Sequence, residues 1–110
     1  MVEQSYLPFR MLTRKHGAQL AYTPMLNSKL MTNVQDYIPK NFSTVPEDYP
    51  LFTQLCGNDP EKILKAAKMV ESESTAIDIN FGCPQNIAKK GNYGSFLLEK
   101  PNVIESIIKE

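Results

Sequence analysis

The chain has 110 residues, of which 42% are hydrophobic and 22% charged, a composition typical of a small globular domain. Twelve basic and twelve acidic side chains cancel, so there is no overall positive field to indicate a nucleic-acid partner, although a local basic patch is compatible with neutrality. Two cysteines are too few for the disulfide framework of a small secreted protein, and no apolar run is long enough to cross a bilayer. We therefore expect a soluble intracellular protein of the cytoplasm, with the nucleus as a second compartment.

The first half of the chain predicts a helix, a strand and a long connection. An apolar stripe predicts a helix over residues 5–16. Residues 20–23 are strand-like and are ended by a proline. Residues 33–50 contain three prolines and predict an irregular connection, preceded by a helical turn near Met31.

The middle of the chain predicts two strands joined by a helix. Residues 51–55 are rich in strand formers, and Asp59 and Pro60 then provide the cap and the first position of a helix. Apolar residues recur along this helix at spacings of three and four, which leaves the opposite side charged. A second strand is expected at residues 76–80. Such βαβ units build either an open doubly wound sheet or a closed barrel with helices outside.

A last amphipathic helix is predicted over residues 101–109, so strands and helices alternate along the chain and indicate the α/β class. A (β/α)8 or TIM barrel typically needs about 250 residues. Within that fold, the chain would supply only the first half and would leave an open edge. We then expect a fragment of a longer protein, or a truncated gene product, that is inactive alone.

Gln54 is the first candidate site residue, because functional groups of parallel α/β proteins lie beyond the carboxyl ends of the strands. It is an amide within an apolar run. Burying an amide without a partner costs roughly 1–3 kcal/mol, so a partner is expected. A flavin or another heteroaromatic ring is one candidate, and a neighbouring strand or a buried water molecule is the other.

Cys83 is the second candidate, because Gly82 and Pro84 present its thiol at the mouth of a strand. A thiol with a pKa near roughly 8.5 is mostly protonated at neutral pH and can donate a proton, whereas a nucleophilic cysteine needs a nearby cation. The only histidine, His16, is predicted at the opposite end of the sheet, which disfavours a Cys-His nucleophile. A small half-buried structural cysteine is the alternative.

Residues 89–94 predict a basic, glycine-containing loop at the same end as Cys83. Lys89 and Lys90 are candidates for phosphate contact and Tyr93 for stacking on a base, with a solvated turn as the alternative. We expect no metal site, because the two cysteines and the histidine include no close-spaced ligand pair.

Several motifs together resemble the tRNA-dihydrouridine synthase family. Asp-Ile-Asn-Phe-Gly-Cys-Pro stands at residues 78–84, followed by Lys-Gly at 90–91 and Gly-Ser-Phe-Leu-Leu at 94–98. Tyr-Thr-Pro-Met at 22–25 and Gln-Leu-Cys-Gly at 54–57 extend the resemblance to nearly the whole chain. These variants are most similar to the eukaryotic branch that modifies positions 16 and 17 of tRNA.

The resemblance implies that residues 1–110 are part of a flavin-binding TIM-barrel catalytic domain, without its C-terminal half and the helical RNA-binding domain. It implies an oxidoreductase that reduces uridine in tRNA to 5,6-dihydrouridine, with FMN as cofactor and NADPH as reductant. Hydride would pass from N5 of the flavin to C6 of uracil, and Cys83 would deliver the proton to C5. A monomer is expected at full length. The implied cofactor contacts are Met1, Val2 and Gln54, and the implied tRNA contacts are Asn80, Lys89, Lys90 and Tyr93.

Two alternatives stay open at this point. A dihydroorotate or dihydropyrimidine dehydrogenase has a similar barrel and also places a cysteine or serine against a pyrimidine, but it acts on free bases. A truncated fragment without activity would serve at most as a binding module.

Overall fold

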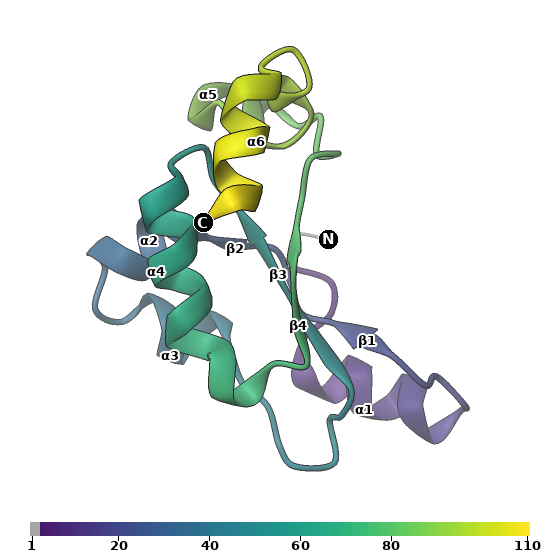
Figure 1. Ribbon diagram of the computed structural model, residues 1–110. Helices are drawn as coiled ribbons and strands as arrows, with labels where there is room; N and C mark the ends of the chain where they lie inside the picture. Colours follow the sequence, from purple (N-terminus) through teal and green to yellow (C-terminus); the bar gives the residue numbers. More distant parts are fainter. Residues whose placement is uncertain (1–2) are drawn as a thin grey trace.

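The computed structural model describes residues 3–110 and shows a parallel sheet with helices packed around it (Figure 1). Its strands are β1 (Ala21–Tyr22), β2 (Leu26–Asn27), β3 (Leu51–Cys56) and β4 (Ala76–Ile79). Its helices are α1 (Leu7–Lys15), α2 (Ser28–Asn33), α3 (Tyr37–Asn41), α4 (Pro60–Val70), α5 (Asn86–Gly91) and α6 (Pro101–Lys109). Two 3-10 helices, η1 (Glu71–Glu73) and η2 (Gly94–Leu97), complete the described elements.

The predicted βαβ unit is confirmed. β3 is the centre of the sheet and pairs in parallel with each of the other strands. β4 lies beside it with Gln54 opposite Asp78, and α4 connects the two strands. The Asp59 carboxylate caps α4 by accepting a hydrogen bond from the Lys62 backbone N–H at 3.3 Å, as the sequence predicts.

The strand expected over residues 20–23 continues beyond Pro24 as β2. Four residue steps separate Tyr22 from Leu26, whereas three separate their partners Phe52 and Leu55, so one extra residue bulges out of the ladder. Proline suits this position because it has no N–H to donate. The hydroxyl of the buried Thr23 accepts a hydrogen bond from the Gln54 backbone N–H at 2.9 Å, in place of a backbone carbonyl.

The main core lies on one face of β3. Leu55 packs there against the apolar stripe of α4, and α2 and α6 add further buried side chains. Because side chains alternate along a strand, Phe52 and Gln54 point to the opposite face. The Phe52 ring meets the exposed Tyr22 ring edge to face, with centroids 5.3 Å apart. The buried members of the main core are Leu26, Met31, Leu55, Ile63, Ala66, Val70, Leu97 and Ile107.

Two short helices were not expected. α3 lies inside the predicted irregular connection, and Pro39 is accommodated because it stands in the first turn, where backbone N–H groups have no partner within the helix. α5 replaces the first half of the predicted basic loop. It ends at Gly91, and the next residue, Asn92, caps it with a left-handed backbone and a φ of 52°.

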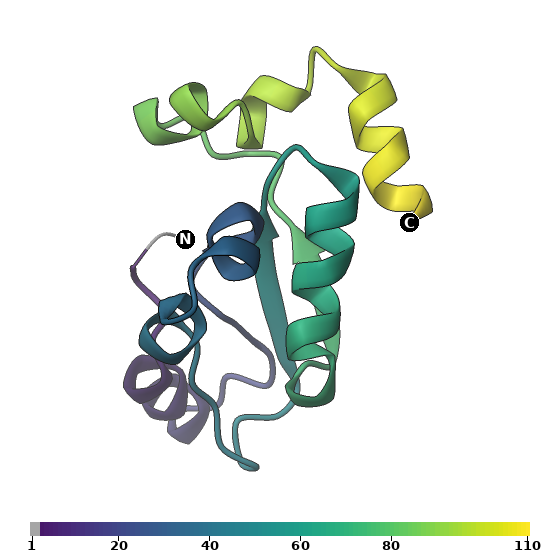
Figure 2. The same ribbon diagram turned by 90° about the vertical axis from the view of Figure 1, so that its left-hand side faces the viewer.

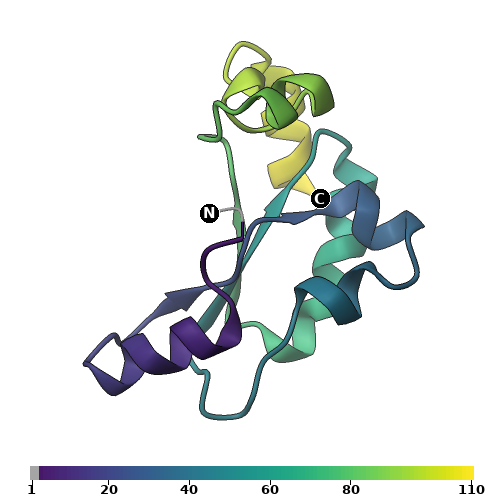
Figure 3. The ribbon, with the colours of Figure 1, turned by 180° about the vertical axis from the view of Figure 1, so that it is seen from behind.

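A buried charge cluster holds α1 in place. Arg10 and Asp48 are each 2% exposed, and the Arg10 Nε atom donates to an Asp48 oxygen at 2.8 Å. The Arg14 Nε atom donates to the other carboxylate oxygen at 2.9 Å, whereas Leu12 is exposed. Burial acts to raise the pKa of Asp48, but the hydrogen bonds and charges of the two arginines hold it below its ordinary value. The cluster fixes α1 to the connection that precedes β3, far from α5 and α6 (Figure 3).

Candidate functional site

The candidate site lies where β3 and β4 end, beneath the segment that carries α5, η2 and α6 (Figures 1 and 2). Gln54 is 8% exposed, so the predicted burial of its amide is confirmed. Asn80 follows β4 directly, and its Nδ2 atom donates to the Gln54 Oε1 atom at 3.2 Å. The sheet therefore brings together two amides that stand far apart in the sequence.

The Asn80 side chain also fixes the loop that carries the thiol. Its Oδ1 atom accepts hydrogen bonds from the backbone N–H groups of Gly82, at 3.0 Å, and of Cys83, at 2.9 Å. An asparagine that accepts from backbone groups two and three residues later is a common local turn. Asn80 thus links Gln54 on β3 to the position of Cys83, a role that the sequence analysis missed.

The other side of the Cys83 loop is held by Gly94 and Ser95. The Ser95 backbone N–H and hydroxyl both donate to the Cys83 carbonyl oxygen, each at 3.1 Å. Gly94 has a φ of +65°, and a Cβ atom placed on it would lie 2.6 Å from the same oxygen. A side chain at position 94 would therefore strain the backbone and displace Cys83. The motif Gly-Ser was noticed in the sequence, but nothing there assigned it this contact.

The two cysteines have different environments. Cys83 is half-buried and packs against a small apolar cluster that includes Cys56 and Tyr93. Cys56 is fully buried, and burial, with a further contribution from the nearby Cys83, raises the pKa of the Cys56 thiol to about 12 despite a hydrogen bond with Tyr93. Both thiols are free. Cys83 is therefore the more accessible of the two cysteines.

The predicted tRNA contacts differ in their exposure. Lys89 and Lys90 are exposed and lie in the last turn of α5, where the sequence had predicted a loop. Tyr93 is only 5% exposed, because its ring packs in the small cluster beside Cys56 and Ala88. That burial does not favour the predicted stacking of Tyr93 on a base. The predicted cofactor contacts Met1 and Val2 lie outside the described residues.

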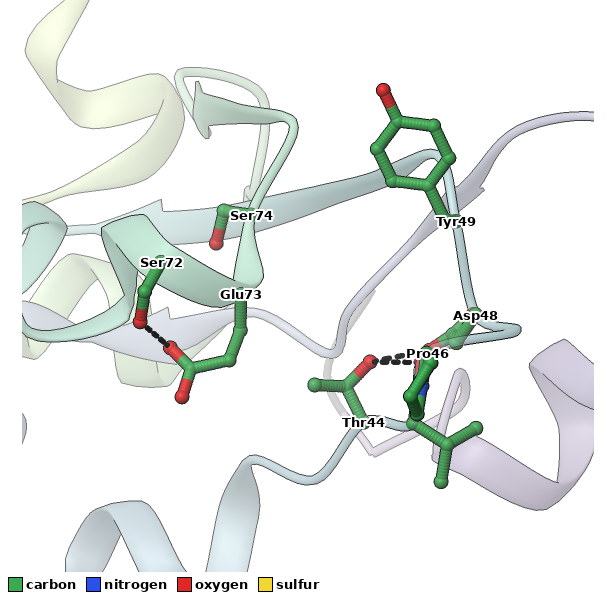
Figure 4. Close-up of a pocket in the computed structure, with 8 residues that line it drawn as sticks. Thr44, Pro46, Asp48, Tyr49, Ser72, Glu73 and Ser74 are labelled. Atoms are coloured by element: carbon green, nitrogen blue, oxygen red, sulfur yellow. Dashed lines mark hydrogen bonds between the residues drawn. The ribbon is translucent and has the colours of Figure 1, made fainter.

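A separate cavity of about 370 Å³ lies at the amino ends of β3 and β4, away from Cys83 (Figure 4). Polar side chains on its wall bond to one another: the Thr44 hydroxyl donates to Asp48 at 3.3 Å, and the Ser72 hydroxyl donates to Glu73 at 2.7 Å. None of the predicted site residues lines it.

Within residues 3–110, no group of three or more histidine, cysteine, aspartate or glutamate side chains is placed to hold a metal ion. None of the helices in this part of the chain combines the length and apolar character needed to span a membrane.

The structure has a half-buried thiol and two linked amides near the carboxyl ends of its parallel strands. This is the arrangement of α/β proteins that carry their functional groups at that edge of the sheet. The model of the family described as dihydrouridine synthase (Dus) matches residues 1–110. The chain therefore belongs to the dihydrouridine synthase family, as the resemblance predicts.

Curated relatives agree with this assignment. The chain is 57% identical over 110 residues to the tRNA-dihydrouridine(16/17) synthase of Schizosaccharomyces pombe, covering 98% of this chain and 28% of that protein. It is 51% identical to the enzyme of the same name from Saccharomyces cerevisiae, over 98% of this chain and 26% of that protein. Identity to the human tRNA-dihydrouridine(20a/20b) synthase-like protein is 36%, over 100% of this chain and 35% of that protein. The chain thus spans about a quarter to a third of the length of these relatives.

Proposed function

We propose that this chain is the amino-terminal part of the catalytic domain of an enzyme that reduces uridine in tRNA to 5,6-dihydrouridine, at positions 16 and 17. The observation that carries the proposal is the 57% identity to a tRNA-dihydrouridine(16/17) synthase across nearly the whole chain. Identity falls to 36% against the relative named for positions 20a and 20b, which favours positions 16 and 17. Membership of this family also favours RNA over the free pyrimidines of the dehydrogenase alternative.

The same proposal includes the fold of the complete protein. The sheet is parallel, its helices α2 and α4 pack on one face, and Gln54 and Asn80 lie at its carboxyl edge. These features suit the first half of a TIM barrel, whose inner face and site would be completed by later strands. The cytoplasm, with the nucleus as a second location, is proposed as its compartment, since both thiols are free.

The residues on this face of the sheet fit a flavin. Gln54 places an amide near the carboxyl end of β3, and the Tyr22 and Phe52 rings offer apolar surface on the same face, nearer the amino end of the strand. Bound FMN, reduced by NADPH, would supply the hydride for C6 of the uracil ring. Gln54, with Met1 and Val2, would hold this cofactor. The names of the yeast relatives include NAD(P)(+), which supports the choice of reductant.

Cys83 would complete the reduction by general acid catalysis. Its S–H bond breaks as the C5–H bond of the pyrimidine forms, and the thiolate then regains a proton from solvent. Asn80 would hold both the thiol loop and the edge of the target base, while Lys89 and Lys90 are the proposed contacts to the rest of the tRNA. The base must leave its stack to reach this site.

The test uses the full-length protein and its Cys83→Ala variant. We expect the variant to retain NADPH-dependent flavin reduction but to lose dihydrouridine formation on unmodified tRNA. Equal product formation by both proteins would remove Cys83 from the mechanism. Activity of the wild type on free uracil or orotate, and not on tRNA, would support the dehydrogenase alternative instead.

A matched experiment addresses the cofactor. We expect Gln54→Ala to purify with less bound flavin than the wild type, measured by absorbance of the released cofactor. Unchanged flavin content would refute the role of Gln54. Mass-spectrometric mapping of dihydrouridine in tRNA from cells lacking the gene would identify the modified position.

A further inference from the structure

A polar cavity of about 200 Å³ lies beyond the carboxyl ends of β2 and β3. The ends of three helices meet around it: Lys29 belongs to α2, Lys62 to α4 and Lys90 to α5. The Asn58 Nδ2 atom donates to the Gly91 carbonyl oxygen at 3.3 Å, which joins the connection after β3 to the end of α5. The cavity is therefore built by segments far apart in the sequence, and no sequence motif indicates it.

The charges around this cavity are unbalanced, although the chain as a whole is neutral. Three lysines line it, and the only acidic side chain among its lining residues is Asp59. That carboxylate pairs with the Lys62 Nζ atom at 2.7 Å and also caps α4. In the described part of the chain, neither Lys29 nor Lys90 forms an ion pair. Two unpaired ammonium groups at one cavity indicate an anionic ligand.

The helix ends themselves contribute little to this attraction. The Asn27 side chain already accepts from the first backbone N–H groups of α2, and Asp59 does the same for α4. Lys29 and Lys90 are thus the cationic side chains available to a ligand. The volume is below the roughly 300–1,000 Å³ typical of sites for drug-sized molecules and cofactors, which favours a single small charged group.

The position of the cavity connects it with the candidate site. Gly91 and Tyr93 line the cavity, and Tyr93 also packs in the cluster that contacts Cys83. The next residue, Gly94, lies against the Cys83 carbonyl oxygen. The cavity and the Cys83 loop thus share the Tyr93 side chain.

We propose that Lys29 and Lys90 bind a phosphodiester group of the RNA substrate beside the nucleotide that reaches Cys83. This inference rests on the proposed function, which supplies RNA as the substrate. Lysines that contact the backbone position an RNA without reading its sequence. The phosphates of the nicotinamide dinucleotide share this chemistry, and the experiment separates the two sources.

The experiment measures binding of unmodified tRNA to the full-length enzyme over a series of salt concentrations. Lys29→Gln and Lys90→Gln are the main variants, because neither lysine has an ion pair to lose within residues 3–110. Lys65→Gln and Lys68→Gln are matched controls on the exposed side of α4. Each loss of a phosphate contact should reduce the slope of log K against log salt by roughly 0.7–0.9. The controls should leave that slope unchanged.

Activity assays give the second readout. The main variants should raise the KM for tRNA and leave kcat at saturating tRNA and the KM for NADPH unchanged. An unchanged salt slope in both main variants overturns the proposal, and a raised KM for NADPH with normal tRNA binding assigns the cavity to the dinucleotide. If the proposed function itself is wrong, the wild type will not reduce uridine in tRNA, and this result differs from a failure of the cavity proposal alone.

Discussion

The carbonyl oxygen of Cys83 accepts two hydrogen bonds from Ser95, one from the backbone N–H and one from the hydroxyl. The proposed proton donor is therefore held from a segment that follows it by twelve residues, and not only by its own loop. Asn80 holds the N–H side of the same residue. Both backbone polar groups of Cys83, its N–H and its carbonyl oxygen, are therefore held by hydrogen bonds. Such fixed positioning suits a group that must meet one carbon atom of a substrate.

Replacing Ser95 with alanine should weaken this clamp while leaving the backbone bond in place. A lost hydrogen bond of this kind is worth about 0.5–1.5 kcal/mol. If the Ser95 hydroxyl acts by positioning the thiol of Cys83, its loss should lower the rate of dihydrouridine formation by about two- to tenfold. NADPH-dependent flavin reduction should not change. Ser106→Ala is a matched control, because within residues 3–110 the hydroxyl of the exposed Ser106 bonds only to the Asn102 carbonyl oxygen of α6. Equal effects on both half-reactions would indicate a general structural role for Ser95.

Replacing Gly94 with alanine should destabilise the protein. Its left-handed backbone costs an ordinary residue at least about 1–2 kcal/mol, and the new methyl group would collide with the Cys83 carbonyl oxygen. The measurement is the midpoint of urea unfolding. Gly82→Ala is the matched control, because nothing lies within 4 Å of a Cβ atom placed there. A midpoint shift no larger than that of the control would contradict the close approach at Gly94.

The two cysteines should react at different rates with an alkylating reagent. Burial raises the pKa of Cys56 to about 12, so at about pH 8 this thiol carries almost no charge and is shielded from solvent. We expect iodoacetamide to label Cys83 first in the native protein and both residues in urea, measured by peptide mass spectrometry. The Cys83→Ala variant should show no fast labelling. Rapid native labelling of Cys56 would contradict its burial.

Asp48→Asn should be strongly destabilising, because it leaves Arg10 buried without its partner carboxylate. Breaking a buried ion pair by removing one partner costs about 3–5 kcal/mol. The pKa of Asp48 is lowered on folding, so its contribution is fully present above the unfolded-state pKa of about 3.9 and is lost as the pH falls through the folded-state value. Unfolding midpoints of wild type and variant should therefore converge in acid.

The control for this variant is Asp36→Asn. Asp36 and Lys40 are largely exposed and their charged atoms lie 3.8 Å apart, so their pairing should contribute no more than about 1 kcal/mol. A small effect of Asp48→Asn, comparable to that of the control, would show that the buried cluster is not essential to α1.

Helices and strands that depend on neighbouring residues were predicted from the sequence. α4 has a capping aspartate, a proline at its first position and an apolar stripe, and it begins and ends close to the predicted residues. The burial of Gln54 followed from its place within an apolar strand. These features depend on residues a few positions apart, which a sequence displays directly.

Contacts between distant segments escaped the sequence analysis. The clamp of Ser95 on Cys83 depends on how η2 folds back, and the burial of Arg10 depends on Asp48 from another segment. Tyr93 was a candidate for stacking on a base, yet its ring packs beside Cys56, since an aromatic residue suits either a surface or a core. Three lysines from three helices could not be grouped before the helices were placed.

The bulge around Pro24 decides which side chains of this stretch enter the core. Four residue steps separate Tyr22 from Leu26, and regular alternation would place both side chains on one face of the sheet. The extra residue turns the chain over, so Leu26 packs in the main core while Tyr22 lies with Phe52 on the other face. We therefore expect deletion of Pro24 to leave Leu26 opposite Leu55 in a regular ladder, because three steps would then match the three between Phe52 and Leu55.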